Sequence, residues 1–148
     1  MARPILAPAL LAAAIATSVC VSPALADDVE ETRRFRVATY SLAFAEAVGQ
    51  MSGITAQCFN AAEMVSEGRV VVLDMLDYAL NVDGLNRAAD AYDRGVREMR
   101  AQYAISCKGA DETRRKLSKD SDRYLAEISK LVGFDEKTKT FTNSGKNQ

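Results

Sequence analysis

The spacing of apolar residues constrains the fold of this chain more than any other feature of its sequence. From residue 37 onward, apolar side chains recur every three or four positions, which is the repeat of one face of an α-helix. The clearest stripe consists of Leu85, Ala88, Tyr92, Val96, Met99 and Tyr103. The valines at 70–72 suggest a strand, but Val72, Leu76 and Ala79 keep the helical spacing. The pattern therefore predicts an all-α fold, a bundle of four or five helices with short connections.

Glycine residues mark where we expect the first helices to be interrupted. Gly49 and the pair Ser52–Gly53 lie inside the first apolar stripe, and glycine costs up to about 1 kcal/mol in a helix interior. We therefore expect a break or kink near that pair, the alternative being one long bent helix over residues 37–65. Gly68 then precedes a short helix that we expect over residues 69–81.

The last two helices carry clearer end signals. Asp83 is a suitable N-cap for the long helix that follows it, and Gly109 is placed to end that helix. The final helix is expected over residues 111–132. Gly133, followed by the apolar Phe134, has the composition of a left-handed C-terminal stop with its hydrophobic contact.

The first 26 residues have the organisation of a secretory signal peptide. Arg3 is the only charged residue among them, and an apolar run over residues 5–21 follows it. Ala24 and Ala26 occupy the small-residue positions that a signal peptidase recognises. We therefore expect export to the periplasm, with cleavage after Ala26.

Two alternatives exist for this leader. The apolar run has about the length that a membrane-spanning helix needs, roughly 17 residues or more, and an uncleaved leader would act as an anchor. Lipidation of Cys20 would tether the chain instead, although Val19 stands where a lipobox requires a small residue. The small residues before Asp27 favour cleavage over both.

The chain that remains after cleavage fits a single domain with one core. We assign residues 27–134 to this helical domain and expect the polar tail, residues 135–148, to be disordered. Loss of Arg3 with the leader leaves 18 basic and 20 acidic residues, a net charge of −2. This balance argues against nucleic acid as a partner.

Cleavage would also leave two cysteines, Cys58 and Cys107. An even number of cysteines in a small exported domain predicts a disulfide, and here one intramolecular pairing exists. The two residues lie 49 positions apart, and closing such a loop constrains the unfolded chain by about 4 kcal/mol in the chain-entropy model. Both lie on apolar stripes, so we expect the bond to join the inward faces of two helices. A redox-active pair is disfavoured because the spacing is not C-x-x-C.

The residue types present exclude several kinds of catalysis. The chain contains no histidine, which removes Ser–His and Cys–His catalysis and most zinc sites. Two acid pairs, Asp74 with Asp77 and Glu63 with Glu67, each share a helix face, and paired carboxylates can hydrolyse a glycosidic bond. Acidic pairs at this spacing are more typical of a solvated helix face.

One segment, NVDGLNRAAD at residues 81–90, partly resembles a calcium-binding loop. Its first and ninth ligand positions would fall on Ala79 and Arg87, and neither side chain supplies a carboxylate oxygen. We therefore expect no metal, no cofactor and no catalytic residue.

Basic residues gather in three clusters. The first covers residues 33–36, and the second consists of Arg94, Arg97 and Arg100. The third, which we name the 114–123 cluster, consists of Arg114, Arg115, Lys116, Lys119 and Arg123. Such rows can bind the phosphates of anionic lipids or an acidic protein surface, yet the acidic residues among them are also typical of solvated, salt-bridged helices. We take the 114–123 cluster as the candidate binding face.

Three segments together resemble a group of known sequences. They are AQCFNA at 56–61, RAQYAISC at 100–107 and DRYLAEISKLVG at 122–133. In these segments the chain resembles small exported two-cysteine helical proteins of unknown function from alphaproteobacteria, over roughly residues 41–133. The resemblance implies an envelope location and a helical fold, and it supplies no activity or catalytic residue.

These observations favour a non-catalytic periplasmic helical protein that binds another component of the cell envelope. The expected partner is an envelope protein or an anionic surface component. A periplasmic inhibitor, an immunity protein or a holdase chaperone is the first alternative. A cell-wall glycan hydrolase that uses carboxylates is the second.

Overall fold

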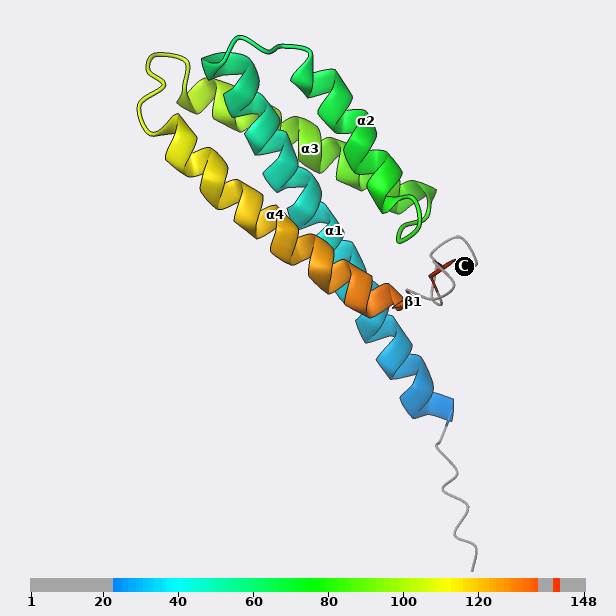
Figure 1. Ribbon diagram of the computed structural model, residues 1–148. Coiled ribbons are helices and arrows are strands. Elements are labelled where there is room, and N and C mark those ends of the chain that lie inside the picture. Colours follow the sequence, from blue (N-terminus) through cyan, green and yellow to red (C-terminus); the bar gives the residue numbers. More distant parts are fainter. Residues whose placement is uncertain (1–22, 136–139, 142–148) are drawn as a thin grey trace, which may run out of the picture.

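The computed structural model describes residues 23–135 and 140–141 (Figure 1). Its helices are α1 Pro23–Cys58, α2 Met64–Leu76, α3 Val82–Gln102 and α4 Ala110–Val132. After α4, two short strands, β1 Phe134–Asp135 and β2 Thr140–Phe141, pair in antiparallel fashion. The prediction of an all-α bundle is confirmed for the described residues, which form four helices.

α1 is the central helix of the bundle. Figure 1 shows α2 and α4 on opposite sides of it, with α3 running alongside. α1 packs chiefly against α3 and α4, and less extensively against α2. Its N-terminal end projects past the other helices, and the first of its described side chains to be buried is Val37. The core therefore begins well after Ala26, while residues 1–22 of the expected leader lie outside the described residues.

The expected break in the first helix is absent, because α1 continues through Ser52–Gly53 to Cys58. Its glycines instead allow α3 to approach closely. A Cβ atom added at Gly53 would lie 2.7 Å from the carbonyl oxygen of Val96, and one added at Gly49 would overlap the backbone of Tyr92. The contact between the two backbones offsets the cost of glycine in the helix.

Gly68 also lies inside a helix rather than before one. The helix expected over residues 69–81 is shifted toward the N-terminus, since α2 spans Met64–Leu76. A Cβ atom at Gly68 would lie 2.7 Å from the hydroxyl oxygen of Tyr92. Glycine at this position thus leaves room for the buried tyrosine of α3.

The caps of α3 differ from those predicted, whereas α4 agrees closely. Asn81, not Asp83, is the N-cap of α3, and its Oδ1 accepts a hydrogen bond from the backbone N–H of Gly84 at 3.0 Å. α3 ends at Gln102, so Gly109 does not end it but precedes α4, with φ of 80°. The C-terminal stop of α4 is confirmed: Gly133 has φ of 67°, and its N–H donates to the carbonyl oxygen of Ser129.

The core is formed where the predicted stripes meet. Its largest fully buried side chains are Tyr92, Ile54, Leu76, Ile128, Val72 and Val132. A smaller apolar cluster of Ile54, Met99, Tyr103 and Ala110 lies at the far end of α1, against Cys58. There the Tyr103 hydroxyl donates a hydrogen bond of 2.8 Å to Thr113 Oγ1, which links the end of α3 to the first turns of α4.

The disulfide pairing is confirmed, but its expected position is not. Cys58 and Cys107 are bonded. Cys58 is the last residue of α1, whereas Cys107 is exposed in the loop between α3 and α4. The bond therefore joins a helix end to a loop rather than the inward faces of two helices.

The tail expected to be disordered is only partly described. Asp135, Thr140 and Phe141 belong to the short strand pair. Residues 136–139 and 142–148 lie outside the described residues, so the expectation of disorder stays a prediction there.

Candidate functional site

A groove runs along the surface of α1 between α2 and α4, with a volume of about 570 Å³. It exists because α2 and α4 lie on opposite sides of α1 and leave part of that helix uncovered (Figure 1). Its lining residues are Val48, Met51, Ser52, Thr55, Met64, Glu67, Gly68, Val71, Arg114, Arg115 and Ser118. We call it the α2–α4 groove.

The floor of the α2–α4 groove is apolar. Val48 and Met51 come from α1, and Met64 and Val71 come from α2. Met64 is 40% exposed and Val71 is 55% exposed, so the floor presents adjoining apolar surface to solvent. The Thr55 hydroxyl in the floor donates to the carbonyl oxygen of Met51 at 2.8 Å, so its proton is already used within the helix. Flexible methionines allow such a floor to adapt to different apolar shapes.

The two edges of the groove carry opposite charges. Arg114 and Arg115 lie on the α4 edge, and Glu67 lies on the α2 edge. Arg114 is held loosely by Asp111, at 3.4 Å, and its guanidinium stands 5.1 Å from the centroid of the Phe59 ring. Because the contact with Asp111 is long and exposed, most of the hydrogen-bond donors of Arg114 remain available to a ligand.

The residues of the 114–123 cluster do not all lie at the groove. Only Arg114 and Arg115 line the groove, while Lys116 and Lys119 are exposed outside it. Arg123 forms an ion pair with Asp120 at 3.1 Å and stacks over the ring of Tyr124. These last three residues fit the solvated-face interpretation.

The other basic clusters are paired in part. Arg94 forms a salt bridge of 2.9 Å with Glu46 across the α1–α3 interface, and this contact raises the pKa of the guanidinium. Arg33 and Arg34 share the carboxylate of Glu30. Arg97 is exposed on α3.

The acid pairs do not come together in the groove. Of the four residues considered for glycoside hydrolysis, Glu67 lines it, whereas Glu63, Asp74 and Asp77 do not. Hydrolysis of a glycosidic bond needs two carboxylates on either side of the bond, about 5–10 Å apart. A single carboxylate facing two arginines does not supply that arrangement.

Within residues 23–135, no helix is long and apolar enough to cross a membrane. The described part of the chain also contains no group of three or more His, Cys, Asp or Glu side chains that could hold a metal ion.

The sequence contains one signal for the groove floor. Val70, Val71 and Val72 are consecutive, and consecutive residues on a helix point about 100° apart, so the core cannot bury all three. Only Val72 is buried. A surplus of apolar residues in one turn thus indicates an apolar surface outside the core.

No protein family matches this chain, and no match was found among curated proteins or among solved structures.

Proposed function

We propose that this protein is a non-catalytic binding protein of the cell envelope, and that its α2–α4 groove holds an amphipathic acidic helix of a partner protein. The observation that carries this proposal is the apolar floor bordered on one edge by Arg114 and Arg115. Burial of Met64 and Val71 under a partner would contribute favourable free energy, at about 25 cal/mol per Å² of apolar area.

A helix is the partner element that suits this surface best. α1 already has helices packed along three sides, and a guest helix in the groove would cover the side between α2 and α4. Amphipathic helices bind in such grooves through apolar residues spaced three or four apart. The edge charges define the orientation: acidic residues of the guest face Arg114 and Arg115, and a basic or neutral edge faces Glu67.

An envelope location is supported by four features. The leader has the organisation of a signal peptide, and a disulfide is typical of exported domains. Cleavage after Ala26 would leave intact every described side chain that is buried, since burial in α1 begins at Val37. The resemblance to exported two-cysteine helical proteins points to the same compartment.

Site-specific cross-linking in intact cells tests this proposal. A photo-reactive amino acid at Val71 should give one dominant protein adduct, and the cross-linked peptide should be amphipathic and acidic. The matched control carries the same group at Arg97, which is exposed on α3 and outside the groove. Equal adducts from both positions would refute the groove as the binding surface.

Charge-reversal variants distinguish a specific role of the groove edge from an effect of the total positive charge. Arg114→Glu combined with Arg115→Glu should abolish the adduct formed at Val71. Lys116→Glu combined with Lys119→Glu changes charge equally on the same helix, outside the groove, and should preserve it. If both double variants lose the adduct alike, the 114–123 cluster acts only through its total charge.

A holdase chaperone is the second candidate, and the same exposed apolar residues favour it. Phe59, Met64, Val70 and Val71 are each at least 40% exposed. A chaperone would give many unrelated adducts at Val71, without a shared acidic helix. A single target would instead agree with a dedicated binding protein, including an inhibitor or immunity protein.

A further inference from the structure

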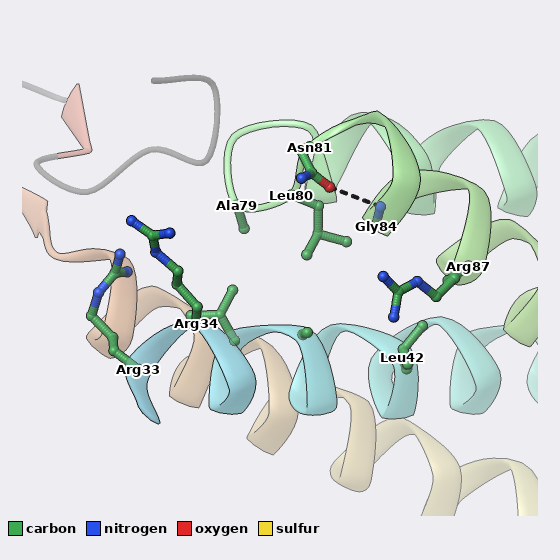
Figure 2. A pocket seen from close by; sticks show the side chains of 10 residues that line it. Arg33, Arg34, Leu42, Ala79, Leu80, Asn81, Gly84 and Arg87 are labelled. Carbon is green, nitrogen blue, oxygen red and sulfur yellow. Dashed lines mark hydrogen bonds between the residues drawn. The ribbon is translucent and has the colours of Figure 1, made fainter. Parts of the chain in front are cut away.

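A second cavity lies between the N-terminal half of α1 and the turn that connects α2 to α3 (Figure 2). Its volume is about 380 Å³, within the lower range of small-molecule sites. None of its lining residues belongs to the α2–α4 groove, so the two sites are independent. We call this cavity the arginine pocket.

Three arginines reach the arginine pocket from two elements. Arg33 and Arg34 rise from α1, and Figure 2 shows Arg87 extending from α3 into the space between α1 and the turn. The Glu30 carboxylate accepts hydrogen bonds from Arg33 Nε, at 2.8 Å, and from Arg34 Nε, at 3.0 Å. Among the described residues, Arg87 has no carboxylate partner. The described residues that line the pocket thus include three arginines and no acidic residue.

Two polar groups of the pocket, Arg33 and Asn81, are held in place before any ligand binds. Arg33 also donates from Nη1 to the carbonyl oxygen of Leu131, at 3.4 Å, which ties it to the end of α4. Asn81 accepts from the Gly84 N–H through Oδ1, so its amide nitrogen is turned away from that bond and can donate (Figure 2). Donors fixed in this way lose less conformational entropy on binding an anion.

The remaining wall of the pocket is apolar. Val37, Ala38 and Leu42 of α1 face Ala79 and Leu80 of the turn. An inorganic anion would contact only the arginine side of such a cavity, whereas an organic anion with an aliphatic body would also cover the apolar wall. Planar carboxylates match the fork of guanidinium donors particularly well.

The geometry points to a binding site for a small organic carboxylate with an aliphatic body. The carboxylate accepts from the Arg87 guanidinium, and the Asn81 amide provides a second donor. The aliphatic part lies against Ala38, Leu42 and Leu80. This assignment does not depend on the partner helix proposed for the α2–α4 groove.

Calorimetric titration of the purified, disulfide-bonded protein with three probes tests the assignment. Hexanoate should bind. Hexanol has the same aliphatic chain without the charge and should not bind. Inorganic phosphate has the charge without the chain and should bind more weakly than hexanoate. Absence of heat with hexanoate at millimolar concentration would overturn the assignment.

Two variants locate the binding. Arg87→Gln should weaken hexanoate binding by about tenfold to a hundredfold, as expected for loss of a charge-assisted hydrogen bond. Arg87 is exposed, so this variant should fold normally, and Arg97→Gln on the solvent face of the same helix is the matched control. Ala38→Leu should block the apolar part of the pocket and abolish binding without removing any charge.

Three outcomes would contradict the assignment. If hexanoate binds equally to the Arg87→Gln and Arg97→Gln variants, the pocket is not the site. If phosphate binds as tightly as hexanoate and Ala38→Leu has no effect, the aliphatic requirement is wrong. If hexanol binds as well as hexanoate, the arginines do not recognise the charge.

Discussion

Tyr92 shows how single residues specify the contact between three helices. The side chain comes from α3, is fully buried, and donates from its hydroxyl to the carbonyl oxygen of Val65 in α2 at 2.8 Å. Gly49 of α1 lies against its backbone, and Gly68 of α2 lies against its hydroxyl. A large polar side chain is thus accommodated because two neighbouring helices have no side chain at the point of contact.

A double-mutant cycle tests this arrangement. Gly68→Ala should destabilise the protein by about 1–3 kcal/mol, because the new Cβ would lie 2.7 Å from the Tyr92 hydroxyl oxygen and 2.7 Å from Ser52 Oγ. Tyr92→Phe should cost about 1 kcal/mol through the lost hydrogen bond. In the double variant the clash with the hydroxyl is gone. Its loss of unfolding free energy, measured in urea, should therefore be smaller than the sum of the losses of the two single variants. Additive losses would show that the hydroxyl and Gly68 do not interact.

The same tyrosine should make stability depend on pH in alkaline solution. Burial raises the pKa of the Tyr92 hydroxyl above its ordinary value of about 10. Above that value the unfolded chain releases the proton while the folded chain retains it, so stability falls as pH rises. The urea midpoint should therefore decrease between about pH 9 and 11, and less so in Tyr92→Phe. An equal decrease in both proteins would assign the effect to other groups.

At the scale of helices, the small residues between α1 and α3 fix how closely the two can approach. Gly49 and Gly53 of α1 face Tyr92 and Val96, and on α3 a Cβ atom at Gly95 would overlap the backbone of α1. Each of these glycines lowers intrinsic helix stability by about 1 kcal/mol relative to alanine. The interface compensates because the tightly packed backbones gain dispersion contacts along both helices.

Gly49→Ala should consequently be destabilising although alanine is the better helix former. The new methyl group would meet backbone atoms of Tyr92, which cannot move aside by a change of rotamer. We expect a net loss of about 2 kcal/mol, the gain in helix propensity being smaller than the cost of overpacking. Gln57→Ala, at an exposed position of the same helix, is the control. It should change the midpoint of unfolding in guanidinium chloride little. Higher stability in Gly49→Ala would mean that the helices separate without cost.

The elements that the sequence predicts well are those whose signals are local. α4 was expected over residues 111–132 and spans Ala110–Val132, because its apolar stripe and Gly133 act within the helix itself. The continuity of α1 could not be predicted in the same way. A glycine that breaks a helix and one that admits a neighbouring helix have the same local sequence, and the difference lies in the partner surface.

For the groove, too, the sequence predicts some lining residues and not others. Arg114 and Arg115 belong to a basic cluster that is visible in the sequence, so they were predicted as part of a binding face. Met51 and Met64 have no such signal, since an apolar residue on a helix is usually a core residue. Their exposure depends on the separation of α2 and α4 across α1, and only the assembled bundle determines that separation.

For the whole molecule, the disulfide fixes the end where three segments meet. It connects the last residue of α1 to the loop that leads into α4, beside the small cluster around Ile54 and Tyr103. Replacing both Cys58 and Cys107 by serine should lower the free energy of unfolding by about 2–4 kcal/mol. Urea unfolding of the wild type in reductant should match that of the double variant. No shift of the midpoint on reduction would mean that the unfolded chain is not constrained by this bond.

The disulfide should also influence the α2–α4 groove, because Phe59 follows Cys58 directly and lies under the guanidinium of Arg114. If reduction frees the end of α1, Phe59 no longer positions Arg114 at the groove edge. A cation–π contact contributes about 0.5–1 kcal/mol, so affinity should fall about two- to fivefold.

Fluorescence anisotropy with a labelled model helix, apolar on one face and glutamate-rich on one edge, measures this effect. The oxidised protein should bind it more tightly than the folded Cys58→Ser, Cys107→Ser variant. Oxidised Phe59→Leu should show a similar loss, since it removes the ring while keeping the bond. If the serine variant binds as tightly as the oxidised protein, the disulfide stabilises the fold without shaping the groove. The position of Arg114 is then set by α4 alone.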